Sequence, residues 1–280
     1  MLKLIVNADD FGHSDIVNKA VLTSYQNGIL RSASLMANGS SFENAAKIIR
    51  DNPLLDIGMH ITLVGEKPIL VLDKIPTLVD ENGNFSLNAI DFTKRYYSGK
   101  ISFEEVKREI IAQIEKILDY GIRISHIDSH QHLHLLPQIF NIISEIVNRY
   151  KIKFVRYPKE KFSAYMFNDL RSIGRIFQMA AVNFFCYKTM GKIFTRTDYF
   201  TGFYFGGNLN KKNLITLINC LPSRGICELM CHPGLSHDIS VKNQKPYRLV
   251  EEVEALIDGE VFELINRKRI EITTFRALSV

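Results

Sequence analysis

The chain has 280 residues, 46% hydrophobic and 23% charged, the ordinary composition of a globular protein that can bury a full core. The formal net charge of +5 is modest, and basic residues alternate with acidic ones, which argues against a nucleic-acid partner, since such proteins concentrate basic residues in a stripe. No apolar run reaches roughly 18 residues and the first residues lack an export signal, so we expect a cytoplasmic protein without a spanning helix.

Short apolar strands alternate with amphipathic helices in the first part of the chain. Strands are expected at residues 2–7, 32–37 and 56–63, and helices at residues 16–27 and 42–51. Residues 65–100 contain several prolines and glycines and show weak periodicity, which indicates a long functional loop with small local elements.

The same alternation continues to the C-terminus. A helix is expected to begin at Ser102, where Ser102 and Glu105 form the pattern of a capping box. Further elements are strands at residues 124–130, 154–157, 227–232 and 270–274, helices at 137–150, 211–221 and 250–265, and an aromatic-rich excursion at 159–207. This order predicts an α/β fold in a single domain over residues 1–280, with a parallel sheet and its chemistry at the carboxyl ends of the strands.

Histidine and aspartate residues gather at the ends of four expected strands. Asp9 and Asp10 follow the first strand, His60 lies in the third, and His232 ends a later one. Another strand carries His126, Asp128, His130, His132 and His134. Each residue alone has a structural explanation, such as a helix cap or a buried histidine with hydrogen-bond partners. Together they form a polar face that needs a metal, a ligand or a hydrogen-bond network to offset its desolvation.

Strand geometry limits which of these side chains could share one metal ion. On a straight strand His130 and His134 would lie about 13 Å apart, too far to share an ion, whereas His130 and His132 could do so. Asp9 and Asp10 point to opposite faces of a strand, so both reach one site only where the strand ends and turns. The spacing predicts one carboxylate and two histidines around one ion with an open position for water, which is a catalytic pattern.

Four motifs in this chain resemble those of the YdjC-like carbohydrate deacetylases, the family of chitooligosaccharide deacetylase. They run in the family's order and cover most of the chain: Val6-Asn-Ala-Asp-Asp-Phe-Gly12, Ile57-Gly-Met-His60, His126-Ile-Asp-Ser-His-Gln-His-Leu-His134 and Met230-Cys-His-Pro-Gly234. Three other stretches resemble the branch associated with hopanoid biosynthesis, namely Val64-Gly-Glu-Lys-Pro68, Val155-Arg-Tyr-Pro158 and Asp198-Tyr-Phe-Thr-Gly202.

The resemblance implies a (β/α) barrel of the glycoside hydrolase/deacetylase type with long loop excursions. It implies that Asp10, His60 and His130 hold one divalent metal ion, Mg or Zn. It places Asp9 as the general base and His232 as the general acid in removal of an acetyl group from an N-acetylated sugar. It also suggests a homodimer.

The remaining polar residues of the strand ends are given supporting roles. Asp128, His132 and His134 are expected to orient the ligands, and Arg156 either contacts the substrate or forms an ordinary ion pair. His126 is expected to be a structural histidine.

Two other functions fit the same residues. One is another metal-dependent amidohydrolase or phosphoesterase, because His-x-His motifs occur there around two metal ions. The other is a non-catalytic sugar- or lipid-binding protein, although binding alone needs neither a base nor an acid. The apolar segment 173–194 is interrupted by polar and basic residues, so we expect a buried or surface-lying helix there. Lysine and arginine flank it, and it could lie on a membrane surface.

Overall fold

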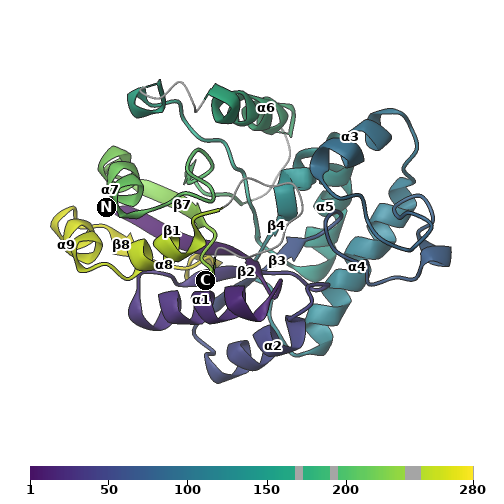
Figure 1. Cartoon of the computed structure of the whole chain (residues 1–280), viewed down its shortest axis with the longest axis horizontal. Coiled ribbons are helices and arrows are strands. Elements are labelled where there is room, and N and C mark those ends of the chain that lie inside the picture. Colours follow the sequence, from purple (N-terminus) through teal and green to yellow (C-terminus); the bar gives the residue numbers. More distant parts are fainter. Residues whose placement is uncertain (168–172, 190–194, 237–246, 280) are drawn as a thin grey trace.

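A curled parallel β-sheet lies at the centre of the molecule, and helices pack around it (Figure 1). The computed structural model describes residues 1–167, 173–189, 195–236 and 247–279. The strands are β1 (Leu2–Phe11), β2 (Ser32–Leu35), β3 (Asp56–Ile61), β4 (His126–Ser129), β5 (Phe154–Val155), β6 (Tyr199–Thr201), β7 (Gly225–Cys231) and β8 (Glu271–Ile272).

The strand order shows how the sheet curls. It is β5-β4-β3-β2-β1-β7-β6, with β8 paired to β1, and the paired strands run parallel. Parallel bridges join Phe154 to Thr195 and Glu160 to Phe200, so the β5 edge approaches the β6 edge. The predicted α/β fold of the barrel type is therefore confirmed.

The outer helices follow the predicted alternation. They are α1 (Asp15–Asn27), α2 (Phe42–Asp51), α4 (Phe103–Asp119), α5 (Pro137–Tyr150), α7 (Lys211–Cys220), α8 (Leu249–Leu256) and α9 (Gly259–Arg267). Residues at helical spacing bury one face of each, as Val106, Ile110 and Ile114 do in α4. This burial closes the barrel core from outside.

The two excursions each contain a helix, of which the sequence indicated only the second, over residues 173–194. In the first, α3 (Ala89–Tyr97) begins at Asn88, whose side chain accepts hydrogen bonds from the backbone of Ile90 and Asp91. The second contains α6 (Ile173–Thr189), and residues 190–194 of the predicted apolar segment lie outside the described residues. Within the described ranges, no helix is both long and apolar enough to cross a membrane.

Two local predictions were wrong. Ser102 precedes α4 but makes no side-chain cap bond. The other half of the capping box is also missing, because the Ser102 backbone N–H donates to Thr77 and the Glu105 carboxylate accepts from the backbone N–H and hydroxyl of Thr77, 2.7 Å each. The helix expected at residues 250–265 is divided into α8 and α9. Asp258 lies between them and caps α9 by accepting from the backbone of Glu260 and Val261.

Candidate active site

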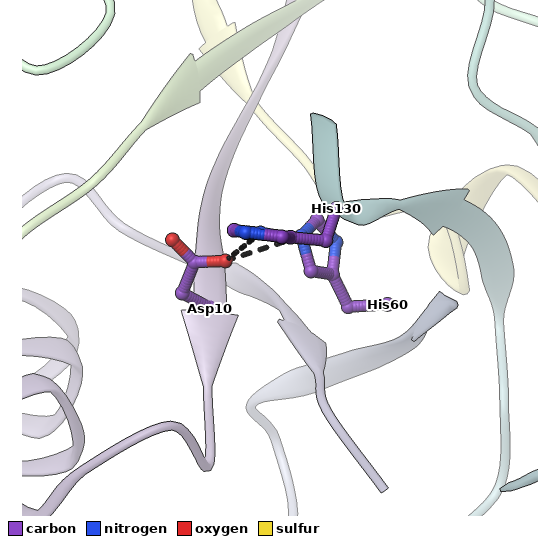
Figure 2. Close-up of side chains that lie close together, drawn as sticks. All are labelled: Asp10, His60 and His130. Carbon is purple, nitrogen blue, oxygen red and sulfur yellow. Dashed lines mark hydrogen bonds and ion pairs between the residues drawn. The ribbon is translucent and has the colours of Figure 1, made fainter. Parts of the chain in front are cut away.

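Three side chains from three strand ends face one another (Figure 2). Asp10 lies near the end of β1, His60 in β3, and His130 directly after β4. The Asp10 Oδ1 atom is 3.3 Å from Nε2 of His60 and 2.9 Å from Nδ1 of His130. One ligand atom from each of the three lies within 4.8 Å of the others. We call Asp10, His60 and His130, which could hold a metal ion, the metal triad.

An irregularity in β1 places its two neighbouring aspartates, Asp9 and Asp10, in different surroundings. The strand continues to Phe11 rather than turning after Asn7, but its register with β2 shifts between Ala8 and Phe11. Asp10 has a φ of 63°, in the left-handed region that a regular strand never uses. The Asp10 side chain is therefore partly exposed, whereas Asp9 stays buried at 3% exposure.

The chain leaves β4 earlier than the expected strand at residues 124–130. Gln131 and His132 have φ angles of 54° and 55°, so the backbone turns immediately after His130. His132 consequently points away from the metal triad and packs against the ring of Phe203, with a centroid distance of 5.4 Å. Among the described residues, the close groups of possible ligand atoms include His130 but not His132. Both residues lie beyond the strand, so strand spacing does not apply to them.

The other polar residues of this run divide into one that contacts the metal triad and two that do not. Asp128 Oδ1 lies 2.7 Å from Nδ1 of His60 and so turns the opposite nitrogen of that ring toward Asp10. His134 instead contacts the Ser129 hydroxyl, at 2.7 Å, and the backbone oxygen of Arg156. His126 contacts Ser34 and stacks on Phe275 beneath the site.

The charge around His60 favours a cation at its Nε2 atom. Burial opposes protonation of His60, but the Asp128 and Asp10 carboxylates outweigh it and raise the pKa of His60 to about 10. Burial likewise opposes ionisation of Asp10, yet His130 and His60 hold its pKa well below the ordinary value. A divalent cation fits this place, because two imidazoles and one ionised carboxylate are suitable donors and leave coordination positions open.

A second, fully buried cluster lies beneath the metal triad, and Arg156 is its centre. Arg156 Nη2 lies 2.6 Å from Oδ1 of Asp9 and 2.7 Å from Oδ2 of Asp128, and its Nε lies 2.6 Å from Oε1 of Glu228. We call Asp9, Asp128, Arg156 and Glu228 the Arg156 network. The Arg156 side chain is 0% exposed, so it forms ion pairs in this structure and is out of reach of a substrate.

Glu228 is a site residue that sequence reasoning missed. It is the one charged residue of β7, an otherwise apolar strand, and that pattern was the available signal. Burial raises the pKa of Glu228 to about 7 against the attraction of Arg156. Asn7 was also missed, although its amide donates to Asp9, at 3.1 Å, and to Ser34.

The Arg156 network argues against a second metal ion. Ligand atoms of Asp9, His60 and Asp128 also lie within 4.8 Å of one another. The Arg156 guanidinium, however, already supplies the positive charge between Asp9 and Asp128. A cation in that place would have to displace a buried ion pair, at a large cost in desolvation.

His232 borders the site from the end of β7. Its backbone N–H donates to Oε2 of Glu252 at 2.6 Å, which anchors the residue directly after the strand. Its Nε2 atom lies 3.9 Å from Oδ2 of Asp9, and its ring faces that of Tyr247 at 5.8 Å. The structure thus brings Asp9, His232 and the metal triad to one end of the sheet.

A hollow of about 490 Å³ opens beside this site, within the first excursion. It begins at Gly65, where an added Cβ atom would be 3.9 Å from Nε2 of His130. Its lining combines apolar surface, in part from Phe85 and Leu87, with the polar side chains of Glu66, Lys67, Asn84, Ser86 and Arg95.

Comparison with known proteins places the chain in a family. A family model described as YdjC-like protein matches residues 3–267. The chain belongs to the YdjC-like family. It is 30% identical over 276 residues to a carbohydrate deacetylase of Clostridium beijerinckii, covering 98% of this chain and 99% of that protein. A carbohydrate deacetylase of Geobacillus stearothermophilus is 31% identical, with 97% and 96% covered.

A solved structure supports the same membership in the YdjC-like family. An Enterococcus faecalis protein, to which cellobiose-phosphate cleavage has been ascribed, superposes with a TM-score of 0.75 at 26% identity. The match covers 99% of each chain. The predicted family and barrel fold are therefore confirmed, and the named relatives confirm that this YdjC-like chain is an enzyme of the hydrolase class.

Proposed function

We propose that this YdjC-like protein is a metal-dependent carbohydrate deacetylase that removes the acetyl group from an N-acetylated sugar of the N-acetylglucosamine type. The observation that carries the proposal is the metal triad, whose ligand atoms lie within 4.8 Å of one another beside Asp9 and His232. The two relatives named as carbohydrate deacetylases support the same activity.

The metal triad would hold one divalent ion, Mg or Zn, through Oδ1 of Asp10, Nε2 of His60 and Nδ1 of His130. Such an ion supplies Lewis acidity, which lowers the pKa of water and polarises an acetyl carbonyl. Asp128 fixes the His60 ring by its 2.7 Å contact with Nδ1, so the donor nitrogen is oriented before binding.

Asp9 and His232 are proposed to move the protons. Asp9 would take a proton from the attacking water as general base. Arg156 holds both of its oxygens, at 2.6 Å each, but a carboxylate accepts several hydrogen bonds, so Oδ2 still has acceptor capacity. His232 Nε2 would donate a proton to the leaving amine, which is a poor leaving group without it. Glu252 anchors His232 at its backbone.

The hollow beside His130 is proposed to hold the sugar. Its lining offers hydrogen-bond donors and acceptors from Lys67, Asn84 and Ser86, which suit sugar hydroxyl groups. Its entry at Gly65 borders the metal triad, so a sugar in the hollow could present an N-acetyl group to Asp10 and His130.

Acetate release tests the proposal. The protein is stripped of metal, reloaded with magnesium, zinc or cobalt, and assayed on N-acetylglucosamine, chitooligosaccharides and a lipid-linked N-acetylglucosamine. We expect acetate release that depends on the added metal, with one ion bound per chain. Absence of release from every substrate, with one metal ion bound, would overturn the proposed activity, and two bound ions would favour another class of metal hydrolase.

A further inference from the structure

The outer side of α6 presents several exposed apolar side chains. Phe177 is 71% exposed, Tyr187 65% and Phe184 55%. With Ile173, Ala180 and Ala181 they occupy one side of the helix, because their spacing of three and four residues matches the helical repeat. We call these six residues the α6 outer face. Figure 1 shows α6 at the edge of the molecule.

The opposite side of α6 connects this surface to the active site. Met179 packs in one cluster with Phe203 and Met230, and Met230 is two residues from His232. Arg175 donates to the backbone oxygen of Gly206 and lies over the ring of Phe203, 5.1 Å from its centroid. The α6 outer face therefore lies about one helix diameter, roughly 10 Å, from side chains that border the site.

Positive charge surrounds the C-terminal half of α6. Lys188 is exposed on the helix itself, with its Nζ 5.5 Å from the ring centroid of Phe184. Arg196 lies over the ring of Tyr157, whose hydroxyl donates to the backbone oxygen of Cys186 at 2.7 Å. The described residues of α6 include no acid, and neither Lys188 nor Arg196 forms an ion pair with a carboxylate in the described part of the chain.

We propose that the α6 outer face docks on the surface of an anionic phospholipid bilayer. Exposed aromatic side chains with Lys188 beside Phe184 match the apolar and anionic layers of a bilayer surface. The helix is not long and apolar enough to span the bilayer, so it would lie in the interface. A second copy of this chain fits less well, because the described residues of α6 offer no carboxylate to pair with Lys188 in a symmetric contact through this face.

Docking would place the active site next to the membrane. Together with the proposed deacetylase activity, on which this step rests, it indicates that the acetylated sugar is carried on a lipid. The docking itself depends only on the α6 outer face and can be measured without turnover.

Vesicle sedimentation tests the docking. The full chain is mixed with vesicles of phosphatidylcholine alone or with an equal part of phosphatidylglycerol. We expect binding to the anionic vesicles that weakens in high salt. The double variant Phe177→Ser and Phe184→Ser should bind at least about tenfold more weakly, since each phenylalanine contributes by its buried apolar area. Lys188→Glu should reduce binding by about fivefold or more.

A matched control separates this face from general surface hydrophobicity. Leu54 is 79% exposed and lies between α2 and β3, so Leu54→Ser should bind vesicles like the unaltered protein. Thermal unfolding monitors the fold of every variant. No sedimentation with anionic vesicles, or equal binding by the double variant, would overturn the docking.

The same experiments identify the other outcomes. If the unaltered protein is a dimer that the double variant dissociates, and neither binds vesicles, the face is a contact between two copies and the proposal is wrong. A protein that binds vesicles but releases no acetate would retain the docking and lose the proposed function.

Discussion

The metal triad and the Arg156 network share two pairs of near neighbours in the sequence, Asp9 with Asp10 and Asp128 with His130, yet only the metal triad reaches solvent. Asp10 and His130 are each 21% exposed, whereas Asp9 and Asp128 have side-chain exposures of 4% and 0%. Asp128 joins the two clusters through its contacts with both His60 and Arg156. The difference teaches that the partly exposed metal triad rests on the buried Arg156 network. In that network each carboxylate lies close to a positive partner, Arg156 or His60.

The largest expected effect separates Asp9 from Asp10. Asp9→Asn should lower turnover by about 10²- to 10⁴-fold, the usual contribution of a general base, while one metal ion still binds. Asp10→Ala should lose both metal and turnover, because it removes a ligand. Acetate release and metal content per chain provide the two measurements. Full turnover by Asp9→Asn would show that Asp9 is not the base.

Substitution of Arg156 tests how far the buried Arg156 network stabilises the protein. Arg156→Met should lower the free energy of unfolding by about 3–5 kcal/mol, because it leaves Asp9, Asp128 and Glu228 buried without their cation. Urea unfolding measures the loss. The control is Arg267→Met at the exposed end of α9, which should change stability by less than about 0.5 kcal/mol. Similar losses in the two variants would contradict a central role for the network.

Gly58 tests how tightly the support is packed under the site. A Cβ atom added at Gly58 would lie 2.2 Å from Cε1 of His126, whose ring is stacked on Phe275 at 3.9 Å and has little room to move. Gly58→Ala should therefore cost about 3 kcal/mol of stability in urea unfolding. Gly259→Ala serves as control, because nothing lies within 4 Å of its added Cβ atom. Unchanged stability in Gly58→Ala would mean that the His126 and Phe275 rings can move to make room for the added methyl group.

The smallest effect concerns protonation in the buried layer. Burial lowers the pKa of His126 to about 4, from an ordinary value near 6.5 in the unfolded chain. As the pH falls from 6.5, His126 is protonated in the unfolded chain but stays neutral in the folded protein until about pH 4. The free energy of unfolding therefore falls with pH in this range. The loss should reach about 2 kcal/mol by pH 5.

His126→Gln isolates this contribution. Urea unfolding measures the free energy of unfolding of both proteins at pH 6.5 and at pH 5. On going to the lower pH, the unaltered protein should lose about 2 kcal/mol more than the variant. Parallel pH dependence in the two proteins would mean that His126 takes up its proton in the folded state.

Hydrophobic periodicity and local motifs determined most of the fold from the sequence. Alternating strand and helix patterns predicted the parallel sheet, and the strand-end motifs placed Asp10, His60 and His130 at one edge. This succeeds because strand direction and side-chain alternation follow from local backbone geometry. The excursions were less predictable. The helix expected at residues 173–194 contains α6, but α3, which begins at the Asn88 cap, was expected only as part of a loop with small local elements.

Only the tertiary structure decided which of two residues close in sequence belongs to the metal triad and which does not. Asp9 and Asp10 separate through a register shift in β1, and His130 and His132 separate through left-handed backbone angles after β4. Arg156 meets Glu228 across 72 residues of sequence. Such choices depend on charge pairing in a buried space assembled from several strands, and a single sequence contains no local signal for the distances within that space.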